Sequence, residues 1–205
     1  MKRIFFLLTM TASAIILSCN KKSNENHNNE TSKNKKKQPT INIAVDNMFD
    51  MERIPYSTAD LGEFPFFTLP KGLIEMNKPL KKNFDVCFFP VNGKMTPFEG
   101  QLYKANISAQ QGQDFSQHYF EMSLDDLLVS KGAVKVFDGE INQQEYDRYY
   151  NQDPNKGEEG DMGYPGERIK FYVIRSKEKG NIYVQYTANN AAGKLNILQT
   201  ENTHN

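Results

Sequence analysis

A strongly polar stretch near the N-terminus, residues 20–40, limits what the rest of the chain can fold into. Its sequence, NKKSNENHNNETSKNKKKQPT, contains no large apolar side chain. Such a segment cannot bury enough apolar surface to offset the entropy lost on ordering, so we expect a disordered, basic tether. The tether leaves residues 41–205 as the part that folds, and this length supports a single domain with its own hydrophobic core.

The residues before the tether have the composition of a secretory signal. Lys2 and Arg3 give a positive start, residues 4–17 are mostly apolar, and the small Ser18 precedes Cys19. The apolar run is shorter than the roughly 20 residues that a membrane-spanning helix needs. The alternative is a buried first helix with an incidental cysteine, but the order of charged, apolar and small residues favours the signal.

The tetrapeptide ILSC at residues 16–19 resembles the lipobox of bacterial lipoproteins. This resemblance implies that residues 1–18 are a signal peptide and that cleavage leaves Cys19 as the first, lipid-modified residue. Residues 19–40 are then the lipidated cysteine and its tether. Asn20 after the cysteine fits the sorting rule by which enteric lipoproteins reach the outer membrane. We therefore expect a lipid anchor in the cell outer membrane, with the domain facing either the periplasm or the cell surface.

Charge is spread unevenly along the chain, although the formal net charge of the whole is zero. The tether is basic, whereas the domain over residues 41–205 carries a net charge of −6. An acidic domain lacks the basic face that nucleic-acid binding requires, so we expect no nucleic acid as a partner. The lysine run at residues 33–37 is either a solvated spacer or a contact to anionic lipid headgroups.

Two β-rich runs, residues 83–91 and 94–109, flank Asn92-Gly93, the strongest short sequence signal for a β-hairpin. Upstream of them, prolines punctuate residues 46–71 and exclude a central strand there. Alternating or β-branched residues predict further strands at 41–45, 133–137, 168–175, 181–187 and 194–199.

Residues 114–132 repeat apolar side chains at helical spacing and end on Lys-Gly, a helix stop. Ser123 with Asp126 predicts a second helical start inside this segment. Asn142 with Glu145 three residues later is a capping box that predicts a short helix to about residue 150. These elements predict an α+β domain: an antiparallel sheet made of the hairpin and a C-terminal meander, with two helices packed on one face.

Several stretches of the domain resemble a domain of envelope proteins from Bacteroidetes and other Gram-negative bacteria. In those proteins it commonly precedes an OmpA-like peptidoglycan-binding domain. The resemblance implies an envelope location and a structural or binding role, and it identifies no active residue. This chain ends after its last expected strand, so peptidoglycan anchoring by an OmpA-like module is not carried over. The stretches that carry the resemblance are residues 60–72, 89–100, 115–126, 132–138 and 169–197.

Catalysis by a cysteine–histidine pair needs an exposed thiolate beside a base. Cys87 and His118 are the candidates within the domain, but Cys87 lies in an apolar strand, where a buried, inert thiol is expected. Asp125 and Asp126 are adjacent on a helix and point in different directions, so they do not form an acid–base couple. We expect no enzymatic activity.

The sequence contains no cluster of His, Cys, Asp and Glu with the tight spacing of a zinc site. Residues 153–161, DPNKGEEGD, mix oxygen ligands with glycines, as calcium requires. Glycine nevertheless falls at the fifth rather than the sixth position, and the glutamate that closes an EF-hand loop is missing. We expect an acidic solvent loop without metal or cofactor, and calcium binding is the alternative.

Four tyrosines lie in or beside a glycine-rich loop at residues 151–167: Tyr146, Tyr149, Tyr150 and Tyr164. Tyrosines beside such a loop are typical of binding surfaces. We expect Tyr149, Tyr150 and Tyr164 to anchor a partner, and packing in the core or at its rim is the alternative.

Taken together, these features predict a lipid-anchored outer-membrane lipoprotein whose single domain has a non-catalytic binding or accessory role. The expected partners are the membrane, through the N-terminal lipid, and an unidentified envelope protein. Two alternatives remain open: a purely structural envelope spacer, and a hydrolase of unknown substrate.

Overall fold

The computed structural model describes residues 49–201. The expected signal peptide, Cys19, the tether and the strand expected at residues 41–45 lie outside the described residues. Among the helices that are described, none is long and apolar enough to cross a membrane.

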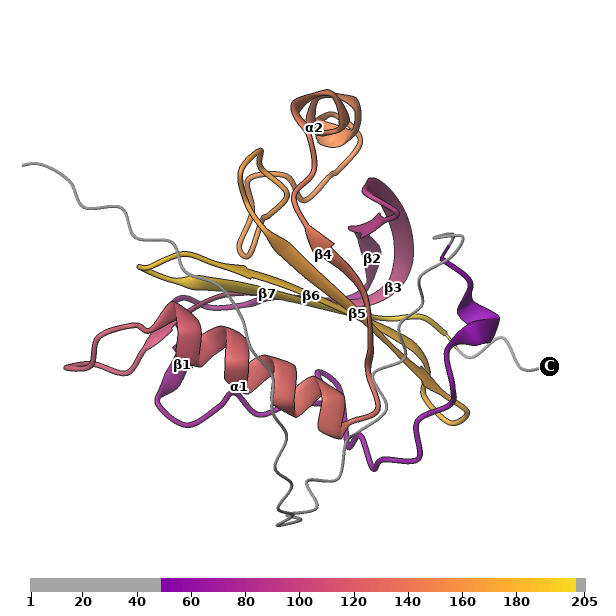
Figure 1. Cartoon of the computed structure of the whole chain (residues 1–205), viewed down its shortest axis with the longest axis horizontal. Coiled ribbons are helices and arrows are strands. Elements are labelled where there is room, and N and C mark those ends of the chain that lie inside the picture. The colour runs from indigo at the N-terminus through magenta and orange to yellow at the C-terminus, as the bar shows by residue number, and fades with distance from the viewer. Residues whose placement is uncertain (1–48, 202–205) are drawn as a thin grey trace, which may run out of the picture. The chain divides into compact units, whose positions relative to one another are not determined.

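The described residues form one mixed α+β domain (Figure 1). The strands pair antiparallel throughout, in the order β1-β3-β7-β6-β5-β4, and β2 also pairs with β3. The elements in chain order are η1 (Met51–Arg53), β1 (Leu73–Glu75), β2 (Leu80–Val91), β3 (Lys94–Ala109), α1 (Gln117–Ser130), β4 (Val134–Gly139), α2 (Gln143–Tyr150), β5 (Ile169–Ser176), β6 (Gly180–Ala188) and β7 (Gly193–Gln199).

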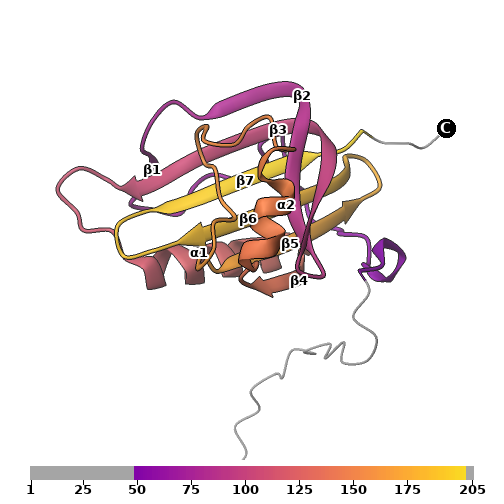
Figure 2. The same cartoon turned by 90° about the horizontal axis from the view of Figure 1, so that it is seen from above.

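The β2–β3 hairpin confirms the prediction made from Asn92-Gly93. Both residues have positive φ angles, 51° and 76°, as a two-residue turn that matches the strand twist requires. One end of β3 pairs with β7, and its other end carries the hairpin, which rises away from the sheet in Figure 1 and crosses over the other strands in Figure 2. Gly100 permits this departure, because a Cβ there would lie 2.0 Å from the Gln199 carbonyl oxygen.

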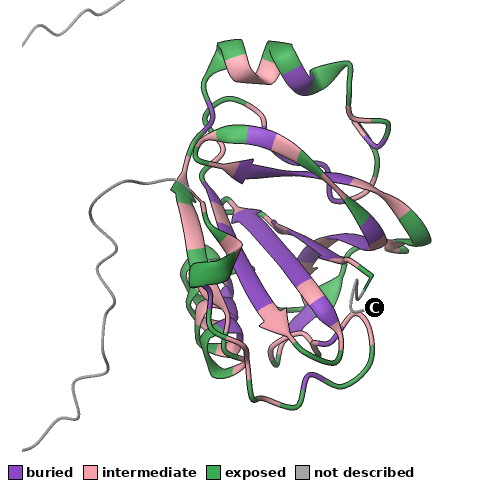
Figure 3. Cartoon of the chain, turned by 90° about the vertical axis from the view of Figure 1, so that its right-hand side faces the viewer, coloured by how far each residue is buried: buried purple, intermediate pink, exposed green. Residues whose placement is uncertain are grey.

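Alternation along the central strands divides the interior into two faces. On β6, Ile182, Val184 and Tyr186 join the apolar cluster that includes buried residues of α1. Tyr183 faces the opposite side, where it packs with Phe89 of the hairpin and other apolar residues. The meander is therefore buried on both sides, as the colouring of Figure 3 shows.

Helix α1 begins at Gln117, three residues later than its sequence onset at residue 114 implies. Ser116 is the N-cap, and its hydroxyl accepts a hydrogen bond from the Tyr119 N–H at 3.2 Å. The second start predicted at Ser123 is wrong, since its hydroxyl donates to the Tyr119 carbonyl within one continuous helix. The predicted stop is confirmed: Gly132 follows the helix with a φ of 77°.

Helix α2 starts where the capping box predicts. The Asn142 side chain accepts from the Glu145 N–H at 2.8 Å, but the Glu145 carboxylate accepts from the Met95 N–H at 2.6 Å instead of returning to the cap. Through Tyr149, α2 packs with Phe88 and Met95 of the hairpin.

The two helices do not share a packing surface. Buried residues of α1 belong to one apolar cluster and Tyr149 of α2 to another, and Figure 1 shows the helices on opposite sides of the sheet. The predicted α+β class and antiparallel sheet are confirmed, and the expected packing of both helices on one face is not.

Candidate functional site

The structure separates the tyrosines that the sequence grouped together. Tyr149 is fully buried, and its ring lies 5.7 Å from that of Phe88. Its hydroxyl donates to the carbonyl oxygens of Met162 and Gly163 at 3.1 and 3.0 Å. The expectation that Tyr149 is a partner-binding anchor is therefore wrong, because packing against Phe88 and Met95 of the hairpin buries the Tyr149 ring.

The other three tyrosines form what we call the tyrosine patch: Tyr146, Tyr150 and Tyr164. The Tyr146 ring lies 5.3 Å from that of Tyr150 and 5.5 Å from that of Tyr164, and Tyr150 is 44% exposed. Sequence reasoning did not assign Tyr146 as an anchor. The four-residue spacing of Tyr146 and Tyr150, which places both on one side of a helix, was the available signal.

The ammonium group of Lys156 lies against the patch and is almost fully enclosed. Its Nζ is 5.2 Å from the ring centre of Tyr146, 4.7 Å from that of Tyr149 and 4.3 Å from that of Tyr164. The side chain is 6% exposed and pairs with the Asp161 carboxylate at 3.2 Å. Burial lowers the pKa of Lys156, and Asp161 opposes this shift.

Asp161 organises residues 153–161, the segment for which calcium binding is the alternative prediction. Besides Lys156, its carboxylate accepts from the Gly157 N–H at 2.9 Å and from the Tyr164 hydroxyl at 2.6 Å. The cation that these oxygens face is thus an ammonium group of the loop itself. Within residues 49–201, no group of three or more His, Cys, Asp and Glu side chains is placed to hold a metal.

The loop at residues 151–167 packs over the sheet, and its Asn155 and residues 160–163 are buried. Lys194 of β7 donates to the Glu167 carboxylate at 2.6 Å, and the Asn106 N–H of β3 donates to Glu159 at 2.9 Å. Gly160 lies so close to β3 that a Cβ there would be 2.7 Å from the Ala105 nitrogen. We refer to residues 151–167 as the cover loop.

Cys87 and His118 occupy different parts of the domain. Cys87 is a free, buried thiol among apolar residues on the side of the sheet that faces the hairpin. His118 lies exposed on α1, which packs on the other side. The structure does not bring this pair together.

Burial raises the pKa of Cys87 to about 12. In a Cys19→Ser background, where Cys87 is the remaining one of two cysteines, we expect a thiol reagent to label it at least about a hundredfold more slowly in native than in denatured protein. The labelling time course with and without urea measures this ratio. Similar rates in both conditions would contradict the buried placement.

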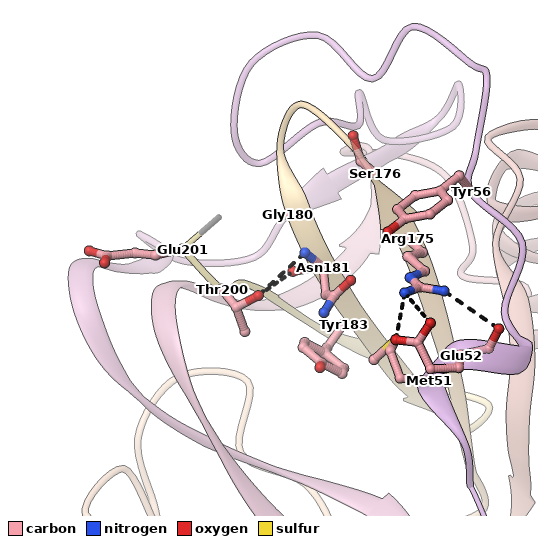
Figure 4. A pocket seen from close by; sticks show the side chains of 10 residues that line it. All are labelled: Met51, Glu52, Tyr56, Arg175, Ser176, Gly180, Asn181, Tyr183, Thr200 and Glu201. Atoms are coloured by element: carbon pink, nitrogen blue, oxygen red, sulfur yellow. Dashed lines mark hydrogen bonds and ion pairs between the residues drawn. The ribbon is translucent and has the colours of Figure 1, made fainter. Parts of the chain in front are cut away.

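A polar pocket of about 310 Å³ lies where the first and last described residues meet (Figure 4). Arg175 donates to both carboxylate oxygens of Glu52 at 2.7 Å and stacks over the Tyr56 ring at 4.3 Å. Because Glu52 is 78% exposed, this ion pair orients the N-terminal segment more than it stabilises the fold. The pocket is lined by Met51, Glu52, Tyr56, Arg175, Ser176, Gly180, Asn181, Tyr183, Thr200 and Glu201.

An apolar groove of about 520 Å³ lies between residues 65–69 and the end of the sheet that carries β1. Its polar contact is that of the Tyr103 hydroxyl with the Glu75 carboxylate at 2.7 Å. Phe66 beside the groove has a φ of 71°, a strained conformation for a bulky residue, and its ring is buried against Phe64 and Phe67. The groove thus belongs to a loop that packing holds in place.

Comparisons of this chain with protein-family models, with curated proteins and with solved structures find no match. The resemblance to the envelope domain therefore stays a prediction, and the geometry of the domain carries the functional argument.

Proposed function

We propose that this protein is a lipid-anchored binding module of the cell envelope, held in the outer membrane through Cys19, and that its tyrosine patch contacts a partner envelope protein. The observation that carries the proposal is the contiguous, partly exposed arrangement of Tyr146, Tyr150 and Tyr164. Tyrosine rings supply large contact areas at a low entropic cost, and they are enriched at interface hot spots.

The patch is held in shape before any partner arrives. Lys156 lies against the Tyr146 and Tyr164 rings, and the Tyr164 hydroxyl donates to Asp161. A surface that is already ordered loses less conformational freedom on binding, which favours affinity.

The ionisable groups near the patch support a binding role over a catalytic one. Lys156 and Asp161 pair with each other, and Glu145 pairs with Arg148 at 2.5 Å. Each of these groups serves to hold α2 or the cover loop in place. An accessory role without catalysis accords with such an arrangement.

We expect Tyr150→Ala to weaken recovery of the partner by about fivefold or more, because truncating an interface anchor costs over about 1 kcal/mol. The thermal midpoint should move little, since Tyr150 is 44% exposed. Crosslinking and co-purification from membranes measure recovery. Tyr119→Ala is the matched control, because Tyr119 is a tyrosine of similar exposure, 37%, on the opposite helix. Equal recovery with both variants would contradict a binding role for the patch.

The anchor is tested separately by Cys19→Ala. We expect this variant to lose metabolic palmitate labelling and to leave the outer-membrane fraction, because several acyl chains together anchor a protein firmly. Tyr150→Ala should keep both properties. Labelling that survives Cys19→Ala would refute the lipid anchor, and recovery of a partner by the unanchored protein would still test the patch.

A further inference from the structure

The buried polar residues of the described chain gather in one place. Six such residues are less than a tenth exposed, and all lie in the cover loop or on the adjacent strands β3, β7 and β6: Lys104, Asn155, Asp161, Gln185, Thr187 and Asn196. Burying polar groups is costly unless their hydrogen bonds are made, so this concentration requires a reason.

Strand register places three of them in a row. Lys104 of β3 is paired with Asn196 of β7, and Asn196 is paired with Gln185 of β6. The chain neighbours of each of these three residues belong to the apolar cluster that includes buried residues of α1. Because side chains alternate along a strand, the three residues face away from α1. The adjacent row toward the cover loop contains Asn106, Lys194 and Thr187.

The next row on the other side is apolar. It consists of Leu102, Leu198 and Tyr183, which are buried beneath the hairpin. The same sheet face thus changes from apolar to polar where the hairpin ends and the cover loop begins. Packing alone does not require polar side chains here, because the apolar row shows that apolar side chains can cover the same strands.

We call the two polar rows the polar floor: Lys104, Asn196 and Gln185, with Asn106, Lys194 and Thr187. Two side chains of this floor have hydrogen-bonding capacity that is not used. The Gln185 Oε1 atom is buried without a partner among the described residues. The Lys104 ammonium, which has three N–H donors, makes a long contact of 3.4 Å with the Asn155 carbonyl oxygen. Lys104 lies under the cover loop, whereas the Gln185 amide lies beside the hairpin, where its nitrogen donates to the Phe88 carbonyl oxygen at 2.9 Å.

The cover loop meets the floor through polar contacts of its own. Asn155 supplies its carbonyl oxygen to Lys104, and Glu167 supplies its carboxylate to Lys194. The Asn196 amide satisfies its neighbours when its nitrogen faces the carbonyl oxygens of Leu195 and Gly160, and in this orientation it donates to the Gly160 carbonyl oxygen at 2.9 Å. Oxygen atoms of the loop therefore occupy the positions where oxygen atoms of a ligand would be recognised.

We propose that the cover loop is a lid over a binding site for a small ligand bearing a carboxylate or a phosphate. When the lid lifts, Glu159, Asp161 and Glu167 leave with it, and the floor exposes the ammonium groups of Lys104 and Lys194. These two lysines are diagonal neighbours across β3 and β7, about 7–8 Å apart at the backbone. Gln185, Asn196 and Thr187 add neutral hydrogen-bonding groups beside them.

Charges at the border of the site do not cancel this cationic character. Asp85 of β2 borders the loop, but it pairs with Lys82 at 2.6 Å. The inward-facing residues of β3, β6 and β7 in the two polar rows include no acid. The chemistry of the opened floor thus selects an anion with hydrogen-bonding oxygens.

Glycines of the lid provide a test with a matched control. Gly160 and Gly157 have φ angles of 68° and 82°, so alanine strains the backbone at both positions. At Gly160 the added Cβ also meets the backbone of β3, whereas at Gly157 nothing lies within 4 Å. Gly160→Ala should lift the lid, and Gly157→Ala should reproduce the strain without lifting it.

The first readout is the labelling rate of Cys87 in the full chain carrying Cys19→Ser. The Gln185 amide nitrogen lies 3.9 Å from the Cys87 sulfur, so the thiol reports on access to the floor. We expect Gly160→Ala to accelerate labelling by about tenfold relative to Gly157→Ala. Equal rates in the two folded variants would overturn the assignment of the loop as a lid.

The second readout is calorimetric binding of inorganic phosphate in one arm and succinate in the other. We expect Gly160→Ala to bind at least one of them about tenfold more tightly than wild type, because the competent state is more populated. Adding Lys104→Met should abolish the gain. The arm that responds distinguishes a phosphate ligand from a carboxylate ligand. Fast Cys87 labelling without any gain in either arm would overturn the site, as would a gain that survives Lys104→Met.

A second pair of variants covers the case in which Gly160→Ala does not fold. Glu167→Gln removes the carboxylate that pairs with Lys194, and the amide oxygen of glutamine can still accept from the Gly163 N–H. Glu158→Gln is its control, because Glu158 is an exposed acid in the same loop. We expect Glu167→Gln, but not Glu158→Gln, to bind phosphate or succinate about tenfold more tightly than wild type. Wild-type affinity in Glu167→Gln would overturn the proposal.

Discussion

Asp125→Ala is expected to lower the free energy of unfolding by about 3 kcal/mol. The Asp125 carboxylate on α1 accepts hydrogen bonds from the Tyr172 and Tyr186 hydroxyls and pairs with Lys170 at 3.0 Å. Alanine removes the acceptor of the Tyr172 hydroxyl and leaves the Tyr186 hydroxyl with only the Glu121 carbonyl oxygen. It also removes one of the two carboxylates that pair with Lys170. Urea denaturation followed by circular dichroism measures the loss.

Asp126→Ala is the matched control for this substitution. Asp126 is the next residue on the same helix and is exposed, so its removal should change stability by less than about 0.5 kcal/mol. Comparable losses for the two variants would show that α1 is sensitive to any change in charge and that the contacts of Asp125 are not responsible.

The same carboxylate makes stability depend on pH. Burial by itself would raise the pKa of Asp125, but hydrogen bonds from Tyr172, Tyr186 and Lys170 hold that pKa below its ordinary value. A group whose folded-state pKa is depressed contributes stability above its unfolded pKa and loses it as the pH falls through the folded value. The stability difference between wild type and Asp125→Ala should therefore be constant above about pH 5 and shrink below about pH 4.

Lys156→Met is expected to cost about 3–4 kcal/mol, because it leaves the buried Asp161 carboxylate without its cation. Asp161 is 6% exposed, so water does not replace the ammonium group. The double variant Lys156→Met/Asp161→Asn removes both charges and should recover a large part of the loss. Denaturant titration of the single and double variants measures this coupling, and a double variant no more stable than the single one would contradict it.

Local sequence signals predicted several elements at residue level. Asn92-Gly93 identified the hairpin, Gly132 the end of α1, and Asn142 the start of α2. Each of these signals acts through the conformation or hydrogen bonds of its own few residues. Such signals can be recognised in a sequence because they do not depend on a residue far away in the chain.

The features that the sequence did not reveal depend on partners brought together by the fold. Whether Tyr149 or Tyr146 faces solvent is decided by where the hairpin places Phe88 and Met95. Arg175 finds Glu52 across 123 positions of the chain, and neither residue carries a local signal of that pairing. The charged residues of the loop at 151–167 predict a solvated segment when each is considered alone, whereas Lys156 and Asp161 neutralise each other inside it.

The polar pocket of Figure 4 has a consequence for the engineering of this domain. Glu52 and Glu201, near the two ends of the described chain, line the same pocket, so these two ends lie close together. Ends that lie together permit circular permutation and insertion into a host loop. New termini belong at the exposed turn of Asn189 and Asn190 between β6 and β7, where cutting the backbone leaves the three apolar clusters whole.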